Sequence, residues 1–366
     1  MAKLVAERLW TTRNATPADL DGILALRQAC FGDVDPIRGR AEGWRWQFTD
    51  NPAGPGYVRL AEHDGRIVGQ YAAIPTRFRL GGNPTPRIMA MSCDTMTHPS
   101  YQKQGMFVTL AKELYDDIAA REQVTTVWGF PNDSSHPGFV GKLGWFDTHI
   151  FPTLVKPLRT RAVLQRYLKS SALAAVLAPV VDTAWWLVAP KAPAPRRCVI
   201  QPVRAFDDRF AALWERHAGL AAVLQVRDPA FLRWRFGGVP AFHYEPWEVL
   251  VDGRLEGYFV TRTLELFGLP FGALVDLFPC PVVDDQITRE ILSFTQRRVA
   301  EQGAAFLTAL LPPHLAHHLR RFGFLKVPDF LNLRRWYFGA RCAAADQPLL
   351  QDIGNWYLTF GDADIV

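Results

Sequence analysis

The stretch Cys93-Asp-Thr-Met-Thr-His-Pro-Ser-Tyr-Gln-Lys-Gln-Gly105, which runs on into Met-Phe-Val-Thr-Leu110, decides how the rest of the chain is interpreted. It predicts a strand that ends at Pro99, a polar turn, and a helix that begins at once. Such a turn directs several backbone N–H groups toward one spot at the positive end of a helix dipole, where a pyrophosphate binds well. Gly105 allows a close approach of the backbone, and Lys103 adds a positive charge. We therefore expect an anion-binding turn here.

The same order of motifs occurs twice along the chain. Residues 44–48 precede a hairpin pattern over 62–71, and residues 232–236 precede a similar pattern over 251–258. Each hairpin has an Asp-Gly pair between alternating apolar residues, which is typical of a two-residue turn. Further matches follow in the same order: strands 93–99 and 275–281, helices 105–123 and 286–302, strands 125–130 and 304–311, and short helices 139–145 and 318–324.

This repetition predicts an internal duplication, with two unrelated α/β domains as the alternative. The predicted fold class is α/β (α+β), with tandem domains that each have a mixed, mostly antiparallel central sheet flanked by helices. We place a first domain at 1–157, a helical and Pro-rich connector at 158–198, and a second domain with a C-terminal tail at 199–366. The aromatic and acidic tail 356–366 is expected to cover a cleft.

The connector contains an apolar run, 171–190, that is about long enough to span a bilayer. Its Asp182 and Pro179 argue against a membrane span. We expect the run to pack on the core, with peripheral contact of residues 162–190 with a membrane surface as the alternative.

Composition indicates a folded protein, with 49% hydrophobic and 21% charged residues in 366. The net charge of +5 suits an anionic ligand, but no basic run with interleaved aromatic residues indicates a nucleic-acid partner. The five cysteines lack CxxC spacing, so we expect no metal site. The N-terminal residues lack the apolar run of a signal peptide, so we expect a cytoplasmic protein.

The polar turn resembles the phosphate-binding signature of the Gcn5-related N-acetyltransferase (GNAT) superfamily, in which Gln or Arg is followed by two residues, Gly, one residue, and Gly or Ala. Gln102 and Gly105 match the first two fixed positions, whereas Phe107 stands where a small residue is usual. Together with Phe130-Pro-Asn132, the spacing is similar to the Eis-type branch. The resemblance covers residues 11–157 well and 199–340 weakly.

The resemblance implies a binding site for acyl-CoA, with acetyl-CoA as the expected acyl donor. The backbone of Met96 and Thr97 would bind the pantetheine arm as an added strand would. The remaining expected contacts to CoA are Gln102, Lys103, Gln104, Gly105, Met106, Phe107, Asn132 and Ser135. In the second half, Asp284 and Asp285 stand at the corresponding turn and would repel a pyrophosphate, so that half is a degenerate copy.

Acyl transfer to an amine needs a base and a proton for the leaving thiolate. Asp94 is the candidate base, directly or through water, although Asp276 repeats it in the second half and leaves a structural role open. His136 is the candidate acid, since Val140 stands where many family members have a tyrosine, and Tyr101 is a weaker candidate. Trp44 and Trp46 could line an acceptor cleft or belong to the core.

The sequence therefore predicts an N-acyltransferase that moves an acyl group, expected to be acetyl, from acyl-CoA to a primary amine of a small molecule, a sugar or a peptide. The alternatives are a Fem-type aminoacyl transferase and a non-catalytic acyl-CoA-binding or scaffold protein. The sequence predicts neither the acceptor nor the oligomeric state.

Overall fold

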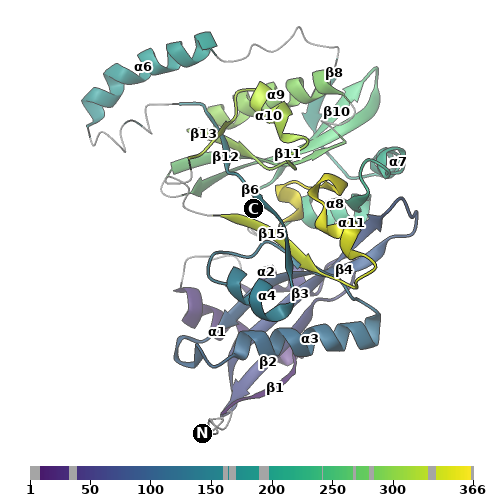
Figure 1. The fold of residues 1–366 in the computed structure, drawn as a ribbon. Helices are drawn as coiled ribbons and strands as arrows, with labels where there is room; N and C mark the ends of the chain where they lie inside the picture. The colour runs from purple at the N-terminus through teal and green to yellow at the C-terminus, as the bar shows by residue number, and fades with distance from the viewer. Residues whose placement is uncertain are drawn as a thin grey trace.

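The computed structural model describes residues 9–32, 39–159, 164, 170–188, 198–240, 242–266, 269–279, 284–328 and 335–363. These residues form two mixed sheets, one in each half of the molecule, with helices packed against them (Figure 1). The fold class expected from the sequence, α/β with mostly antiparallel sheets flanked by helices, is confirmed.

In the first sheet the strands lie in the order β1 (Thr11–Asn14), β2 (Tyr57–His63), β3 (Arg66–Leu80), β4 (Arg87–Thr97), β5 (Val127–Gly129), β15 (Trp336–Arg341) and β6 (Phe146–Phe151), with β9 (Val223–Gln225) and β16 (Trp356–Tyr357) extending from β3. In the second sheet the order is β14 (Leu325–Lys326), β7 (Leu154–Pro157), β13 (Phe306–Ala309), β12 (Leu269–Phe278), β11 (Arg254–Leu266), β10 (Glu245–Val251) and β8 (Cys198–Pro202).

The α-helices of the described residues are α1 (Leu20–Phe31), α2 (Ala41–Phe48), α3 (Met106–Glu122), α4 (His136–Leu143), α6 (Ser171–Val188), α7 (Asp208–His217), α8 (Pro229–Phe236), α9 (Asp285–Glu301), α10 (Ala316–Arg321) and α11 (Gln347–Gln351). Short 3₁₀ turns lie at Pro17–Asp19, Pro99–Tyr101, Ile353–Asn355 and Phe360–Asp362.

The two halves share one order of elements and one set of strand directions. The series α2-β2-β3-β4-α3-β5-α4 in the first half corresponds to α8-β10-β11-β12-α9-β13-α10 in the second. In both, the first three strands pair antiparallel and the fourth joins in parallel. Both predicted Asp-Gly hairpins are present, with positive φ at Asp64, Gly65, Asp252 and Gly253, as a two-residue turn of this type requires.

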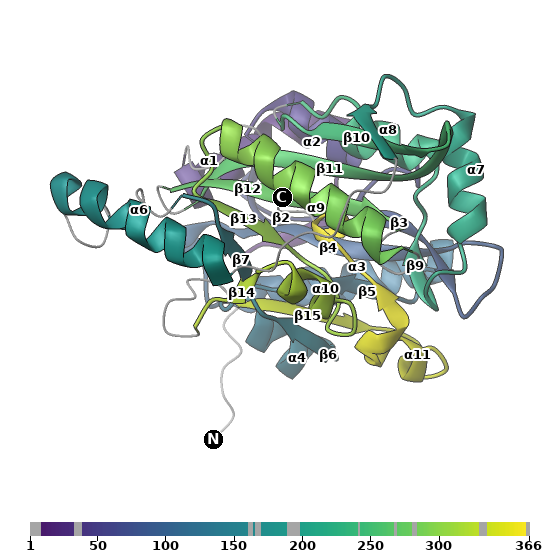
Figure 2. The same ribbon diagram turned by 90° about the horizontal axis from the view of Figure 1, so that it is seen from above.

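The halves exchange strands at the centre of the molecule. Strand β7, from the first half of the sequence, lies between β13 and β14 in the second sheet. Strand β15, from the second half, lies between β5 and β6 in the first sheet (Figure 2). The sheets therefore do not divide at the predicted boundaries 157/158 and 198/199, and the assignment of domains along the chain remains a prediction.

One hydrophobic core joins the two sheets. Trp128 of β5 contacts the rings of Phe78, Phe338 and Trp356, all of which are fully buried. These residues come from both halves of the sequence. The tail 356–363 lies inside this core, where Trp356 and Tyr357 form β16, so it is part of the fold. Residues 364–366 lie outside the described part.

Helices α2 and α8 meet through a reciprocal pair of tryptophans. The indole Nε1 of Trp46 donates to the carbonyl oxygen of Trp234 at 2.8 Å, and Nε1 of Trp234 donates to that of Trp46 at the same distance. Their rings are stacked with centroids 5.1 Å apart. Trp46 therefore links the two halves, as the core alternative for this residue required.

Helix α6 projects from the body of the molecule in both views (Figures 1 and 2). Ala174 and Ala178 are buried, whereas Leu173, Val176 and Val180 are 54%, 69% and 64% exposed. Neither alanine belongs to a hydrophobic core cluster of the described residues, so packing of this segment on the core stays a prediction, and its row of larger apolar residues is open. Among the described residues, no helix has the length and apolar character that a membrane span requires.

Candidate active site

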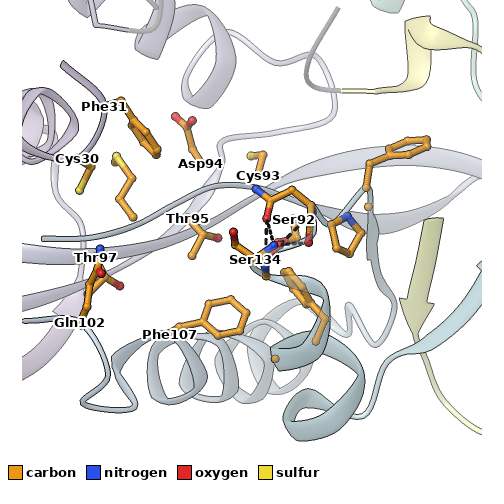
Figure 3. A pocket seen from close by; sticks show the side chains of 18 of the residues that line it. Cys30, Phe31, Ser92, Cys93, Asp94, Thr95, Thr97, Gln102, Phe107 and Ser134 are labelled. Carbon is orange, nitrogen blue, oxygen red and sulfur yellow. Dashed lines mark hydrogen bonds between the residues drawn. The ribbon is translucent and has the colours of Figure 1, made fainter. Parts of the chain in front are cut away.

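The site lies where strands β4 and β5 separate. The two strands pair only through Ala90 with Val127 and Met91 with Trp128. Beyond these pairs β4 continues to Thr97, β5 ends at Gly129, and a cavity of about 780 Å³ opens between them (Figure 3). This volume is in the range of sites that hold a small molecule or a cofactor.

The cavity is bounded by β4 on one wall and by the segment from β5 to α4 on the other. Figure 3 shows Asp94 and Phe31 on one side of β4, and Phe107 and Ser134 on the other. The lining residues are Arg27, Cys30, Phe31, Ser92, Cys93, Asp94, Thr95, Met96, Thr97, Gln102, Phe107, Gly129, Phe130, Pro131, Asn132, Ser134, Ser135, Gly138, Phe139 and Trp145. The cavity thus reaches from the α1 side of the sheet to the α3 and α4 side.

The predicted polar turn connects β4 to helix α3. After the 3₁₀ turn Pro99–Tyr101, both Lys103 (φ 63°) and Gly105 (φ 77°) adopt left-handed backbone, and α3 begins at Met106. Gly105 is the N-cap, and no side chain in the described part of the molecule caps this end of α3. The first N–H groups of a 17-residue helix are therefore left for an anion, which is the arrangement expected from the sequence.

The structure brings most of the predicted site residues together. Asp94, Met96, Thr97, Gln102, Phe107, Asn132 and Ser135 line the cavity. Lys103, Gln104, Gly105 and Met106 are not among the lining residues. Met106 faces the core, where its side chain packs on Gly69, so only its backbone N–H is available to a ligand.

Asp94 sits in a bulge of β4. The register between β3 and β4 shifts between Gln70 and Ala72, and Asp94 has a φ of 48°, which non-glycine residues rarely adopt. Nε2 of Gln70 donates to the Asp94 carbonyl at 2.9 Å, and Nη1 of Arg27 donates to Oδ1 of Asp94 at 2.7 Å. Both members of the Arg27–Asp94 ion pair are 7% exposed. The bulge therefore holds a buried carboxylate at the cavity.

Phe107, the departure from the family signature, is accommodated by a glycine on the facing helix. A Cβ atom at Gly138 would lie 2.6 Å from Cε1 of Phe107. The Phe107 ring contacts Phe139 at 5.1 Å and Tyr71 at 5.9 Å between centroids. A small residue at this position would allow a close approach to the start of α3. The Phe107 ring instead adds an aromatic surface to the cavity.

Asn132 and Ser135 shape the turn that begins helix α4. Oδ1 of Asn132 accepts from the backbone N–H of Ser134 at 3.0 Å and of Ser135 at 2.9 Å. Oγ of Ser135 accepts from the Asn132 N–H at 3.1 Å. These bonds fix the wall of the cavity opposite β4.

His136, the predicted acid, is not in the cavity wall. Its Nε2 lies 2.8 Å from Oδ1 of Asp147, and its ring stacks on Tyr337 with centroids 3.9 Å apart. These contacts hold the start of α4 against β6 and β15. Tyr101 points elsewhere too, since its hydroxyl lies 2.6 Å from Nδ1 of His63 at a separate cavity of about 550 Å³.

Sequence reasoning missed several residues of the wall. Arg27, Cys30 and Phe31 come from α1, and nothing in their local pattern sets them apart from ordinary helix residues. Burial raises the pKa of the Cys30 thiol, although the backbone of Thr97 and the charge of Arg27 act in the opposite direction. Ser92 was also missed, although it lies two residues before Asp94 on the same strand.

The corresponding features of the second half are closed by its own side chains. Asp284 caps α9 by accepting from the N–H groups of Gln286 and Ile287. Asp285 pairs with His318, whose Nδ1 is 2.8 Å from the carboxylate. These contacts occupy the end of α9 that corresponds to the open end of α3.

Asp276, the counterpart of Asp94, belongs to a fully buried network. Its carboxylate accepts from Arg227, Tyr258 and Thr359. Arg227 also pairs with Asp362 at 2.7 Å, which ties the C-terminal segment to the second sheet. Asp276 is thus structural, whereas Asp94 lines a cavity.

Comparison with known proteins agrees with this geometry. Residues 11–146 match the family model described as acetyltransferase (GNAT) domain. The GNAT resemblance expected from the sequence is therefore confirmed for this part of the chain. No curated protein matches the sequence. The resemblance to the Eis-type branch stays a prediction.

Solved structures of similar fold cover nearly the whole chain. A GCN5-related N-acetyltransferase from Anabaena variabilis aligns with a TM-score of 0.62 and 12% identity over 94% of this chain and 75% of that one. A probable N-acyltransferase from Enterococcus faecalis gives 0.64 and 13% over 93% and 75%. Saccharomyces cerevisiae N-myristoyltransferase, solved with bound myristoyl-CoA, gives 0.58 and 11% over 92% and 79%. At these identities the likeness shows the fold alone, and it extends over both sheets.

Proposed function

We propose that the protein transfers an acyl group from acyl-CoA, with acetyl-CoA as the donor, to a primary amine of a small molecule, a sugar or a peptide. The observation that carries the proposal is the cavity between the separated strands β4 and β5, with the uncapped end of α3 beside it. A pantetheine chain fits between two separated strands, because β4 there offers backbone groups that β5 no longer pairs.

In this proposal the donor lies on the α3 and α4 side of the cavity. The backbone N–H groups of Gln102 to Phe107 hold the pyrophosphate at the end of α3, with Lys103 nearby. Met96 and Thr97 pair with the pantetheine arm through their backbone, and Asn132 and Ser135 form the facing wall. The second half does not bind acyl-CoA, since Asp284 occupies the matching helix end.

The amine acceptor enters from the α1 side, where Asp94 lies with Arg27. Acyl transfer requires the amine to lose a proton as the new amide bond forms. Asp94 takes that proton, directly or through a water molecule, and Arg27 fixes the orientation of the carboxylate. His136 lies outside the cavity wall, so its position gives no support to the role of acid predicted for it.

The proposal is tested by release of CoA thiol from acetyl-CoA over a panel of amino sugars, polyamines and peptide amines. We expect turnover by the parent protein and at least about a 100-fold loss of kcat in Asp94→Asn, the usual scale for a lost base. Asp147→Asn is the matched control, since it removes the carboxylate that pairs with His136 outside the cavity and should leave kcat nearly unchanged. Binding of acetyl-CoA without turnover on any amine would favour the non-catalytic alternative. Turnover only with charged transfer RNA would favour the aminoacyl transferase.

We also propose that helix α6 contacts an anionic membrane surface, at the cytoplasmic face of a membrane. Residues 159–197 contain seven Lys and Arg residues and a single acidic residue, so this segment alone carries more positive charge than the net +5 of the chain. Together with the exposed row of Leu173, Val176 and Val180, this charge is complementary to acidic lipid headgroups.

Co-sedimentation with lipid vesicles tests this contact. We expect binding to vesicles that contain phosphatidylserine, weak binding to pure phosphatidylcholine, and loss of binding in Val176→Glu. The control Ile150→Glu introduces the same charge at an exposed apolar residue of β6 and should bind like the parent. Equal sedimentation of the parent with and without vesicles would contradict the contact.

A further inference from the structure

A chain of hydroxyl groups runs from the interior of the first half to the wall of the cavity. The hydroxyl of Tyr115 lies 2.6 Å from that of Tyr71, which lies 2.7 Å from Oγ of Ser92. Nε1 of Trp145 donates to the Tyr115 hydroxyl at 3.2 Å. Tyr71, Tyr115 and Trp145 are buried, and Ser92 lines the cavity.

The direction of this chain follows from its buried end. An indole N–H can only donate, so Tyr115 accepts from Trp145. The buried Tyr115 hydrogen then needs an acceptor, which Tyr71 provides, and the Tyr71 hydrogen is accepted by Ser92 in turn. Burial raises the pKa of Tyr71 well above its usual value and that of Tyr115 to about 12, which keeps both as neutral donors at neutral pH. The hydrogen of Ser92 is the one that remains for the cavity.

Ser92 lies at the point where the strands separate. It is the first residue of β4 beyond the last pair with β5, and its backbone oxygen is 3.2 Å from where a Cβ of Gly129 would be. Its side chain faces α3, as its bond to Tyr71 requires, whereas Asp94 faces α1 and bonds Arg27. A chain-like ligand between the strands therefore ends beside Ser92, with the carboxylate on the opposite side.

We propose that Ser92, oriented by Tyr71 and Tyr115, donates the hydrogen bond and the proton that the leaving CoA thiolate needs. This inference rests on the proposed function. When the carbon–sulfur bond breaks, the electron pair stays on sulfur, and the Ser92 proton forms the new S–H bond. Ser92 recovers a proton from solvent in the cavity that it lines. The proton released by the amine passes to Asp94 and on to solvent, so the transfer leaves the protein unchanged, while Tyr71 and Tyr115 orient Ser92 and keep their own protons.

Ser92 supplies the acid for the leaving thiolate, whereas the candidate acids predicted from the sequence lie outside the cavity wall. Val140 has no proton to give and does not line the cavity, and His136 is engaged with Asp147 and Tyr337. Arg341 lies over the Tyr115 ring, 4.8 Å from its centroid, and its charge opposes the rise in the pKa of that hydroxyl.

The test is the pKa of the thiol of bound CoA, followed through the ultraviolet absorption of the thiolate as pH is raised, because it needs neither turnover nor a known acceptor. A hydrogen bond to the thiolate lowers the thiol pKa. We expect the pKa in Ser92→Ala to be about one unit higher than in the parent, Ser92→Thr to resemble the parent, and Tyr71→Phe to lie between. CoA affinity below that pKa should be similar in all four proteins, which separates this role from support of the fold.

Equal thiol pKa values in the parent and in Ser92→Ala, with CoA bound by both, would overturn the inference and leave the proposed function standing. A thiol pKa in Tyr71→Phe equal to that in the parent would overturn the orienting role of the tyrosines. Failure of the parent to bind CoA would overturn the proposed function together with this inference. If Ser92→Ala does not fold, the comparison of Tyr71→Phe with the parent decides between the outcomes.

Discussion

Lys156 provides a test of the strand exchange, because it is buried only if β7 joins the second sheet. Strand β7 pairs there with β13 and β14, which leaves Lys156 5% exposed. Its Nζ donates to the carbonyl of Phe322 at 2.8 Å and lies 3.9 Å from the centroid of that ring. Both contacts come from the second half of the sequence. The perturbation is Lys156→Met, which keeps the length of the side chain and removes the amine.

Burial lowers the pKa of Lys156 from 10.5 to about 8. Between these values the unfolded chain binds a proton that the folded protein has lost, so stability rises with pH. Each unit of pKa corresponds to about 1.4 kcal/mol, so the parent should gain about 3 kcal/mol relative to Lys156→Met as pH rises from below 8 to above 10. Below pH 8 Lys156 is protonated in both the folded and the unfolded parent. The difference between the free energies of unfolding of the parent and Lys156→Met is therefore constant there.

The assay is urea unfolding of both proteins at intervals from pH 7 to pH 11, with the difference between their free energies of unfolding plotted against pH. Other groups that titrate in this range, such as tyrosines, contribute equally to both proteins and cancel. A difference that does not change with pH would refute the reasoning, since it would mean that Lys156 is solvated and that β7 does not lie between β13 and β14.

Other predictions concern single contacts. Trp46→Phe removes the bond to the Trp234 carbonyl and should lower the free energy of unfolding by about 1–2 kcal/mol in urea titrations; no loss would show that the pair does not join the halves. Gly138→Ala should destabilise by about 1–3 kcal/mol, because its Cβ would overlap Phe107, while the control Gly141→Ala in the same helix has open space and should be neutral or stabilising; equal effects would contradict this packing. Alkylation of Cys30, followed by mass spectrometry, should be slower than that of a free thiol at neutral pH and slower still with acetyl-CoA; unchanged rates would contradict its place in the cavity wall.

The turn at Gln102 to Gly105 could be predicted because its geometry is local. Polar residues, a glycine and the start of an apolar helical pattern follow one another directly, and the structure has left-handed backbone at Lys103 and Gly105. The same holds for the Asp-Gly hairpins, whose turn type depends on two neighbouring residues. The order of elements in each half could therefore be predicted, together with three of the six residues of β4 that line the cavity, Asp94, Met96 and Thr97.

The contacts that cross the molecule could not be predicted. The exchange of β7 and β15 depends on which strand edge each one pairs with in the folded chain. The sequence of a short strand does not specify that partner. His136 shows the same limit, since its distance from the cavity is set by Asp147 and Tyr337 on β6 and β15. Ser92 and Tyr71 are ordinary strand residues in the sequence, and only their pairing across β3 and β4 brings their hydroxyls together.

The proposed function depends most directly on acyl-CoA binding at the turn before α3. The measurement is thermal unfolding with and without acetyl-CoA in the parent, in Gly105→Glu, and in the control Gly253→Glu. Both glycines have positive φ and open space around them, but Gly253 lies in a hairpin of the second half. A ligand at 100 times its Kd stabilises the folded state by about 2.7 kcal/mol. We expect acetyl-CoA to stabilise the parent and Gly253→Glu and to leave Gly105→Glu unchanged; equal stabilisation of all three proteins, or of none, would contradict the account.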